Sequence, residues 1–142
     1  MGVDLSEGLL SYAKKENPKM KFVCEDISEF IVQQKQESFD LIVGTSSFQH
    51  IPSFKERLFL MKHFYRLLTY DGKVMMLNRS LSHWFIRKHR KEISKSLGKY
   101  LLSFGKKSRR DIMVPWTNKG KTFKRYYHLF DLTELKKLSD FS

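Results

Sequence analysis

Short apolar runs alternate with amphipathic stretches over the first 80 residues. Apolar runs lie within residues 2–5, 18–26 and 38–47, and helix-like stretches cover 6–17, 27–36 and 54–68. A turn at "YDG" then leads into a fourth apolar run within residues 69–80. Strand-sized runs that alternate with amphipathic helices are typical of β-α-β units. The pattern therefore predicts an α/β fold with a mainly parallel sheet.

Two of these helices carry further local signals. Ser6 is a suitable N-cap for the helix at 6–17, and Glu7 places a carboxylate at the positive end of its dipole. The helix at 54–68 repeats apolar residues at spacings of three and four, which predicts one buried face. That face consists of Leu58, Met61, Phe64, Tyr65 and Leu68.

The pattern changes after residue 80. Apolar residues recur at helical spacing between Ile86 and Leu101, with lysine and arginine between them. Residues 111–124 are predicted to be irregular, and residues 125–142 to form a short extended run and a final helix with Thr133 as its N-cap. We divide the chain into a core at 1–80 and a substrate-facing region with a final helix at 81–142, both in one domain.

Length and composition indicate one globular domain. The chain has 142 residues, of which 41% are hydrophobic and 30% charged, and no apolar run approaches the roughly 20 residues of a membrane span. No signal-peptide pattern opens the chain. Its single cysteine, Cys24, cannot form an internal disulfide and is expected to fill the core. These features favour a cytoplasmic location.

Positive charge gathers in the second part of the chain. Residues 1–80 hold 11 lysines and arginines against 10 acidic residues, whereas residues 81–142 hold 16 against 5. The net charge of +12 therefore comes almost entirely from residues 81–142. Such a region is typical of a surface that binds a polyanion, most simply a nucleic acid, although a solvated basic surface without a dedicated ligand stays open.

Polar residues end the predicted strands. Asp4, Asp26, Gly44 and Asn78 lie at or just after the ends of four apolar runs. Ligands of open α/β sheets bind at the carboxyl ends of the strands. A carboxylate offers two acceptor oxygens, so Asp4 suits a pair of ribose hydroxyls and Asp26 suits an adenine amino group. Each aspartate could instead be an ordinary turn or cap residue.

Four segments follow one another along the chain in this order: "GVDLSEGLL", "FVCEDISEF", "FDLIVGTSSFQHI" and "YRLLTYDGKVMML". Together they resemble the successive motifs of class I S-adenosylmethionine-dependent methyltransferases. The resemblance implies a Rossmann-like methyltransferase fold and S-adenosylmethionine as the cofactor. It also implies that the cofactor-binding residues are Asp4, Leu5, Asp26, Ile27, Gly44 and Thr45.

The second part of the chain resembles a narrower family. "DIMVPW" followed by "RYYHLFDLTEL" is similar to an insertion in the tRNA wobble-uridine carboxymethyl methyltransferases. His50 matches the second histidine of that family's histidine pair, and Gln49 stands in place of the first. This resemblance implies tRNA or another RNA as the substrate, and it allows an activating subunit as a partner.

The implied acceptor, a carboxylate on a modified uridine, suggests roles for the remaining candidates. Such a carboxylate needs cationic donors rather than a general base. Aromatic rings can stack an extruded base, and arginines can contact phosphates. The candidate catalytic residues are His50, Arg125 and His128, and the candidate substrate-binding residues are Asn78, Trp116, Tyr126, Tyr127, Arg87 and Arg90. The aromatic residues could equally belong to the core, and no metal site is expected.

The family's glycine-rich loop and first strand have no counterpart in this sequence. None of the seven glycines forms a Gly-x-Gly pair, and the family's last two strands are also absent. We expect an incomplete sheet with a gap beside the Asp4 strand, because the absent strand lies there in the family. The gap predicts a rearranged sheet, pairing with another chain or copy, or a fragment of a longer product.

Two other functions stay open from the sequence. The chain could be a catalytically inactive basic module that binds RNA or a partner protein. It could also methylate a small molecule or a lipid, with residues 84–104 lying on a membrane surface as a basic amphipathic helix.

Overall fold

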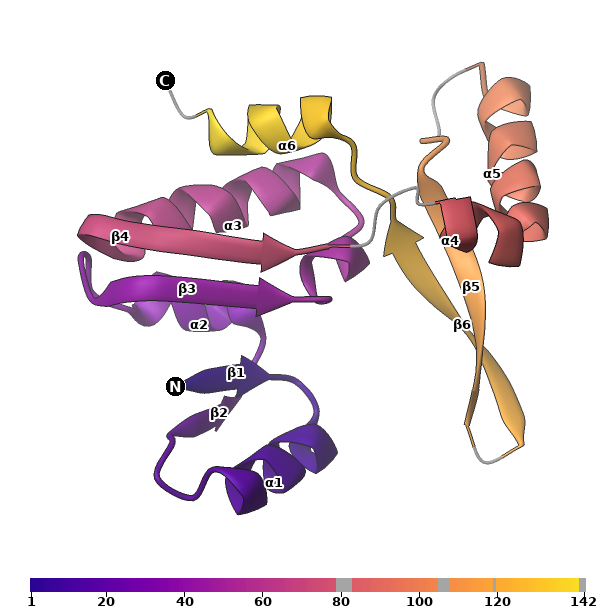
Figure 1. Ribbon diagram of the computed structural model, residues 1–142. Coiled ribbons are helices and arrows are strands. Elements are labelled where there is room, and N and C mark those ends of the chain that lie inside the picture. The colour runs from indigo at the N-terminus through magenta and orange to yellow at the C-terminus, as the bar shows by residue number, and fades with distance from the viewer. Residues whose placement is uncertain (79–82, 105–107, 119, 141–142) are drawn as a thin grey trace.

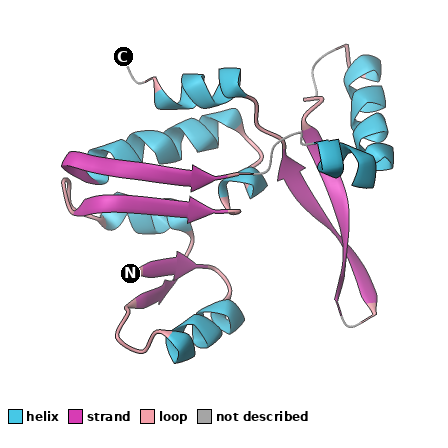
Figure 2. Cartoon of the chain, in the orientation of Figure 1, coloured by secondary structure: helices cyan, strands magenta, loops and turns pink. Residues whose placement is uncertain are grey.

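The computed structural model describes residues 1–78, 83–104, 108–118 and 120–140 (Figure 1). The expected boundary between residues 80 and 81 lies outside the described residues. Helices and strands alternate from the N-terminus to β4 (Figure 2). The elements are β1 (Gly2–Asp4), α1 (Glu7–Glu16), β2 (Phe22–Cys24), α2 (Ile27–Gln33), β3 (Phe39–Thr45), the 3₁₀ turn η1 (Phe48–His50), α3 (Phe54–Leu67), β4 (Leu68–Leu77), α4 (His83–Lys88), α5 (Arg90–Leu102), β5 (Asp111–Asn118), β6 (Lys121–His128) and α6 (Leu132–Ser139).

The strands form three separate pairs. β1 pairs with β2 and β3 pairs with β4, both in parallel, while β5 and β6 form an antiparallel hairpin. The parallel pairs confirm the predicted α/β class. No hydrogen-bonded ladder joins β1 to β3 among the described strands, so the expected gap beside the Asp4 strand is present. The alternative of a sheet rearranged to make these strands neighbours is wrong.

One of the two predicted helix N-caps is confirmed and the other is wrong. Ser6 caps α1, and its Oγ accepts a hydrogen bond from the backbone N–H of Leu9. The predicted cap Thr133 is wrong, because Asp131 caps α6 and its Oδ1 accepts from the N–H of Glu134 at 2.8 Å. An aspartate competes well for this position, and Thr133 then lies inside the first turn.

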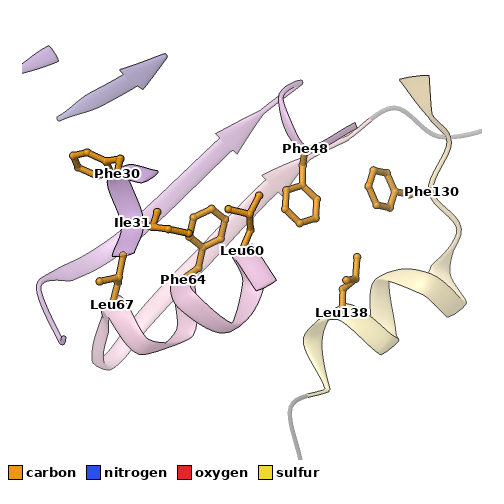
Figure 3. Packing of buried hydrophobic residues seen from close by; sticks show 8 residues of the cluster. All are labelled: Phe30, Ile31, Phe48, Leu60, Phe64, Leu67, Phe130 and Leu138. Carbon is orange, nitrogen blue, oxygen red and sulfur yellow. The ribbon is translucent and has the colours of Figure 1, made fainter. Parts of the chain in front are cut away.

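The main core lies between α2, α3, α6 and one face of the β3–β4 pair (Figure 3). Leu58 and Met61 of the predicted α3 face pack against this core, and Phe64 is fully part of it. Tyr65 is 68% exposed, so its predicted burial is wrong. The face is rotated by about one position, since Leu60 and Leu67 are the residues that α3 buries most completely.

The predicted basic helix is interrupted. α4 ends at Lys88 and α5 begins at Arg90, and Leu97 and Leu101 of α5 are exposed. A second core forms here from Phe85, Ile112, Val114 and Leu129. A hydrogen bond joins α5 to β5: the Oγ of the buried Ser96 donates to the carbonyl of Asp111 at 2.6 Å.

Residues 111–124, predicted to be irregular, belong instead to the β5–β6 hairpin. Ladder pairing runs continuously from Asp111 opposite His128 to Asn118 opposite Lys121. Gly120 adopts a positive φ of 77°, a conformation that suits glycine in a tight hairpin turn. The correction follows from turn chemistry that the apolar pattern alone does not reveal.

Cys24 is exposed, so its predicted place in the core is wrong; it ends β2, which among the described strands pairs with β1 alone. In the part of the chain that the structure describes, no helix is long and apolar enough to cross a bilayer.

Candidate functional site

The carboxyl ends of β1, β3 and β4 point toward the same side of the molecule, where the base of the β5–β6 hairpin lies (Figure 1). This edge therefore collects most of the polar strand-end residues that the sequence singled out. The hairpin itself extends away from the edge, so its tip is presented separately from the strand ends.

Asp4 is the last residue of β1, and one of its two carboxylate oxygens accepts a hydrogen bond. Its Oδ1 accepts from the backbone N–H of Ser6 at 2.8 Å, which fixes the side chain at the entry to α1. Oδ2 has no protein partner among the described residues, and Asp4 is exposed. The following residue, Leu5, is 69% exposed. Asp4 thus offers a fixed acceptor beside an exposed apolar side chain.

Asp26 follows β2 and begins α2. Its Oδ1 accepts from the backbone N–H of Ser28 at 2.8 Å, so it acts as the helix N-cap. Ile27 is half-buried and packs against the main core. Within the described residues no hydrogen bond engages the second oxygen of Asp26, and a backbone N–H at a helix N-terminus favours an acceptor atom of a ligand.

The ends of β3 and β4 are joined by close packing. A Cβ on Gly44 would lie 2.6 Å from Sδ of Met76, so a side chain here would displace Met76. Thr45 is exposed, and Ser46 has a φ of 54° with its N–H donating to the carbonyl of Leu77. This hydrogen bond turns the chain sharply away at the end of β3.

Asn78 follows β4 at the same edge. Its Oδ1 is buried and has no hydrogen-bond partner within the described residues. Because a buried amide oxygen without a partner is costly, the atom is a natural acceptor for a ligand donor.

His50 connects the strand edge to the hairpin. Its Nδ1 donates to the backbone carbonyl of Tyr126 at 2.7 Å, and its ring meets the ring of Tyr127 edge-on at 4.6 Å. In the neutral imidazole, this bond leaves Nε2 as the acceptor nitrogen. The structure thus brings together three of the residues that the sequence proposed: His50, Tyr126 and Tyr127.

The phenol of Tyr126 lies in a partly desolvated position and donates to the carbonyl of Pro52 at 3.3 Å. Burial, reinforced by the nearby carboxylate of Asp111, raises the pKa of Tyr126 well above its ordinary value. The hydroxyl therefore stays protonated and holds the hairpin to the loop before α3.

A raised pKa predicts a specific alkaline effect. The folded chain holds the phenolic proton more tightly than the unfolded chain, so the stability contributed by Tyr126 is present below pH 10 and is lost as the pH rises above it. We expect Tyr126→Phe to lose less stability than the unmodified chain between about pH 9 and 11. Urea unfolding across this range measures the difference, with the exposed Tyr70→Phe as the control. An unchanged pH dependence in Tyr126→Phe would contradict this assignment.

His128 lies deeper than the sequence suggested. It is 3% exposed, and its Nδ1 lies 2.6 Å from Oδ1 of Asp111 while Nε2 lies 2.7 Å from Oε2 of Glu134. Both ring nitrogens therefore face carboxylate oxygens of the chain itself. A substrate carboxylate can reach His128 only by displacing one of them.

His128 belongs to a buried ion-pair cluster that joins α3, the hairpin and α6. Glu134 accepts from Arg57 at 2.9 Å and from Arg110 at 3.2 Å, and Arg110 also pairs with Asp131. The guanidinium of Arg57 further donates to the carbonyl of Ile51. The cluster fixes the base of the hairpin relative to the core.

Of this cluster, only His128 was a candidate site residue from the sequence. A heptapeptide, "HLFDLTE", carries three of its members, with apolar residues between them. Acidic residues near a helix start are ordinarily caps, and this interpretation holds for Asp131. Nothing in the spacing indicates that Glu134 turns inward to meet Arg57, which lies 77 residues away in the chain.

Trp116 and Arg125 meet on the hairpin away from the strand edge. The guanidinium carbon of Arg125 lies 5.1 Å from the Trp116 ring centre, and Phe123 lies directly opposite Trp116. Trp116 is 44% and Phe123 50% exposed. The hairpin thus presents stacked aromatic and cationic groups to solvent.

Arg87 and Arg90 lie on a different surface. Arg87 is near the end of α4 and Arg90 begins α5, and both are exposed. Exposed lysines continue this basic surface along α5 at positions 91, 95 and 99. The structure places these residues beside the hairpin base rather than at the ends of β1 and β3 (Figure 1).

The model of a known family, described as a methyltransferase domain, matches residues 1–76, which is more than half of the chain. The chain belongs to this methyltransferase family. The match runs from β1 to Met76, the last residue but one of β4, and so includes Asp4, Asp26 and the end of β3. No curated protein matches the chain at a significant level.

Solved structures support the same fold for this methyltransferase-family chain. An S-adenosylmethionine-dependent methyltransferase from Methanosarcina mazei is similar at a TM-score of 0.71 and 19% identity, over 96% of this chain and 65% of that one. A Pyrococcus horikoshii protein has a TM-score of 0.65 at 18% identity, with coverages of 97% and 62%. A methyltransferase from Clostridium acetobutylicum, also S-adenosylmethionine-dependent, has a TM-score of 0.59 at 15% identity, with coverages of 96% and 60%. The chain thus spans less than two thirds of each of these structures.

Proposed function

We propose that this chain binds S-adenosylmethionine at the carboxyl ends of its strands and takes part in methyl transfer to RNA, with the carboxymethylated wobble uridine of tRNA as the acceptor. The observation that carries the proposal is the meeting of the strand edge with the hairpin through His50 and Tyr126. It joins a family cofactor region to a basic, aromatic surface.

The residues at the strand ends fit the adenosine part of the cofactor. Asp4 has a free oxygen for ribose hydroxyls, and Asp26 with the N-terminus of α2 offers an acceptor and a donor for adenine. The unpartnered Oδ1 of Asn78 is a further acceptor at the same edge. Membership of the methyltransferase family supports S-adenosylmethionine as the group that these residues hold.

The protein's main contribution to this reaction is to align the methyl donor with the acceptor. S-adenosylmethionine supplies a methyl group on a cationic sulfur, which a nucleophile displaces in line. A carboxylate acceptor is already ionised, so the chain has to hold it and exclude water rather than remove a proton. Arg125 is one of the exposed cations of β6, and because it lies away from the strand edge we assign it to binding the RNA beside Trp116 rather than to holding the acceptor carboxylate. His50 positions the hairpin base, and its Nε2 can contact the acceptor nucleotide.

RNA recognition is proposed to use two surfaces. Trp116, backed by Arg125, offers a stacking platform for an unpaired base. The exposed cations of α4 and α5, with Arg87 and Arg90 among them, suit phosphate contacts. His128 is proposed here to position the hairpin, since Asp111 and Glu134 occupy both of its ring nitrogens.

Methyl transfer is tested directly with methyl-labelled S-adenosylmethionine and a total tRNA fraction. The proposal expects label in the RNA, released by mild base because the product is a methyl ester. Label that resists base would show that the methyl group is on an atom other than the carboxylate oxygen, and would contradict the proposed wobble-uridine acceptor. Salt-sensitive RNA binding without cofactor binding would instead favour an inactive RNA-binding module.

Replacing Trp116 with alanine is expected to weaken RNA binding by about tenfold, since one base–aromatic stack contributes about 1–3 kcal/mol. Filter binding to a tRNA anticodon stem-loop measures the effect. Tyr70→Ala is the matched control, because Tyr70 is fully exposed at the start of β4, away from the hairpin. Equal weakening by both substitutions would argue against a stacking role for Trp116.

A further inference from the structure

A small pocket, here called the lysine pocket, lies between α5 and the β5–β6 hairpin. α5 runs beside β5 (Figure 1), and the hydrogen bond from the buried Ser96 to the carbonyl of Asp111 holds the helix against the strand. Lys95 and Lys99 of α5 and Lys124 of β6 are among the residues that line the pocket. Its volume of about 210 Å³ is below the roughly 300–1,000 Å³ of pockets for drug-sized ligands, so it suits one small group.

Positive charge exceeds negative charge in this pocket. Its three lysines are exposed, and within the described residues no ion pair engages any of them. The two acidic residues that line it, Glu92 and Asp111, each face a histidine nitrogen, at 3.9 and 2.6 Å respectively. Lys95 and Lys99 are four residues apart on one helix, where like charges repel each other. An anion between the lysines would relieve this repulsion.

The lysine pocket adjoins the exposed aromatic pair of the hairpin. Pro115 and Lys124 line the pocket and are opposite each other in the ladder. Trp116 and Phe123 form the next pair toward the hairpin tip. Because successive side chains of a strand point to opposite faces, the pocket and the aromatic pair lie on the two faces of the hairpin. A flexible single strand of RNA can place a base on one face and a phosphate on the other, whereas a rigid duplex cannot.

We propose that the lysine pocket holds one phosphodiester group of an unpaired RNA segment, next to a base that stacks on Trp116. This inference rests on the proposed RNA substrate, and it adds that the RNA is unpaired where it meets the hairpin. Lysine ammonium groups from two elements donate to the oxygens of the same phosphate. A free phosphate ion would satisfy the lysines but would leave the exposed Trp116 uncovered.

The probe is a fluorescently labelled RNA of about ten uridines, whose binding to the full chain is followed by polarisation at several salt concentrations. It carries no carboxymethyl group and is used without cofactor, so the measurement is independent of methyl transfer. The comparison ligand is the same RNA paired with its complement. We expect the single strand to bind more tightly than the duplex by about tenfold.

Lysine substitutions test whether one phosphate is shared across the pocket. Lys95→Ala and Lys124→Ala are each expected to weaken binding of the single strand about fivefold, and to make its salt dependence shallower by about 0.7 in log–log slope. Because both lysines hold one group, the double variant should lose less than about tenfold, where independent contacts would multiply to about 25-fold. Lys91 is the matched control: it is exposed one turn before Lys95 on α5 and does not line the pocket. The effects of Lys91→Ala and Lys124→Ala should therefore multiply.

Three results would overturn the proposal. They are multiplying effects of Lys95→Ala and Lys124→Ala, equal affinity for single strand and duplex, and displacement of the RNA by inorganic phosphate at constant ionic strength, which would indicate a site for a free anion. A chain that binds RNA with any of these results keeps the proposed RNA substrate and loses only the shared phosphate. A chain that binds no RNA at all loses both.

Discussion

Replacing Glu134 with alanine is expected to destabilise the fold by about 3–5 kcal/mol, because it removes one partner of a buried ion pair. The side chains of Glu134 and Arg57 are 9% and 4% exposed. Without the carboxylate, the buried Arg57 would keep its hydrogen bond to the carbonyl of Ile51 but lose its charged partner, and Arg110 would keep its pair with Asp131. A loss of this size is a large fraction of the stability of a small domain.

Urea unfolding measures the loss, and a double-mutant cycle with Arg57→Ala isolates the pair. The exposed Glu16→Ala is the control and should change stability by less than about 0.5 kcal/mol. A loss below about 1 kcal/mol for Glu134→Ala, or strict additivity in the cycle, would mean that the cluster does not hold the hairpin to the core.

Replacing Asp4 with alanine is expected to weaken binding of the adenosyl cofactor by about 100-fold, since hydrogen bonds to a charged acceptor contribute about 1.5–3 kcal/mol each. Asp4→Asn keeps an acceptor for the N–H of Ser6 and should give an intermediate loss. The two variants thus separate the acceptor geometry from the negative charge.

Equilibrium dialysis with labelled cofactor measures these affinities. Asp71→Ala serves as the control, because Asp71 is exposed in the first part of β4, away from the carboxyl edge. If Asp4→Ala binds the cofactor as well as the control does, the cofactor does not lie at the end of β1, and the family's arrangement does not apply to this chain.

The parallel part of the fold was predictable because its signals are local. Apolar runs, the cap at Ser6 and the amphipathic α3 segment each depend on neighbouring residues, and all give the correct element type. The separation of β1 from β3 was predictable only through the family resemblance.

The β5–β6 hairpin and the buried ion-pair cluster were not predictable from such local signals. Residues 111–124 contain Pro115 and few alternating positions, so their pairing depends on the turn at Gly120 and on packing against Phe85. The contact between Arg57 and Glu134 joins residues far apart in the chain. Leu97 and Leu101, which recur at helical spacing in the sequence, are exposed on α5.

The most direct test of the central claim is calorimetric titration of the folded chain with S-adenosylhomocysteine, the product form of the cofactor. We expect one site per chain, with heat that disappears in Asp4→Ala and remains in Asp71→Ala. A folded chain that gives no binding heat with this ligand at any accessible concentration would contradict the cofactor site at the strand ends.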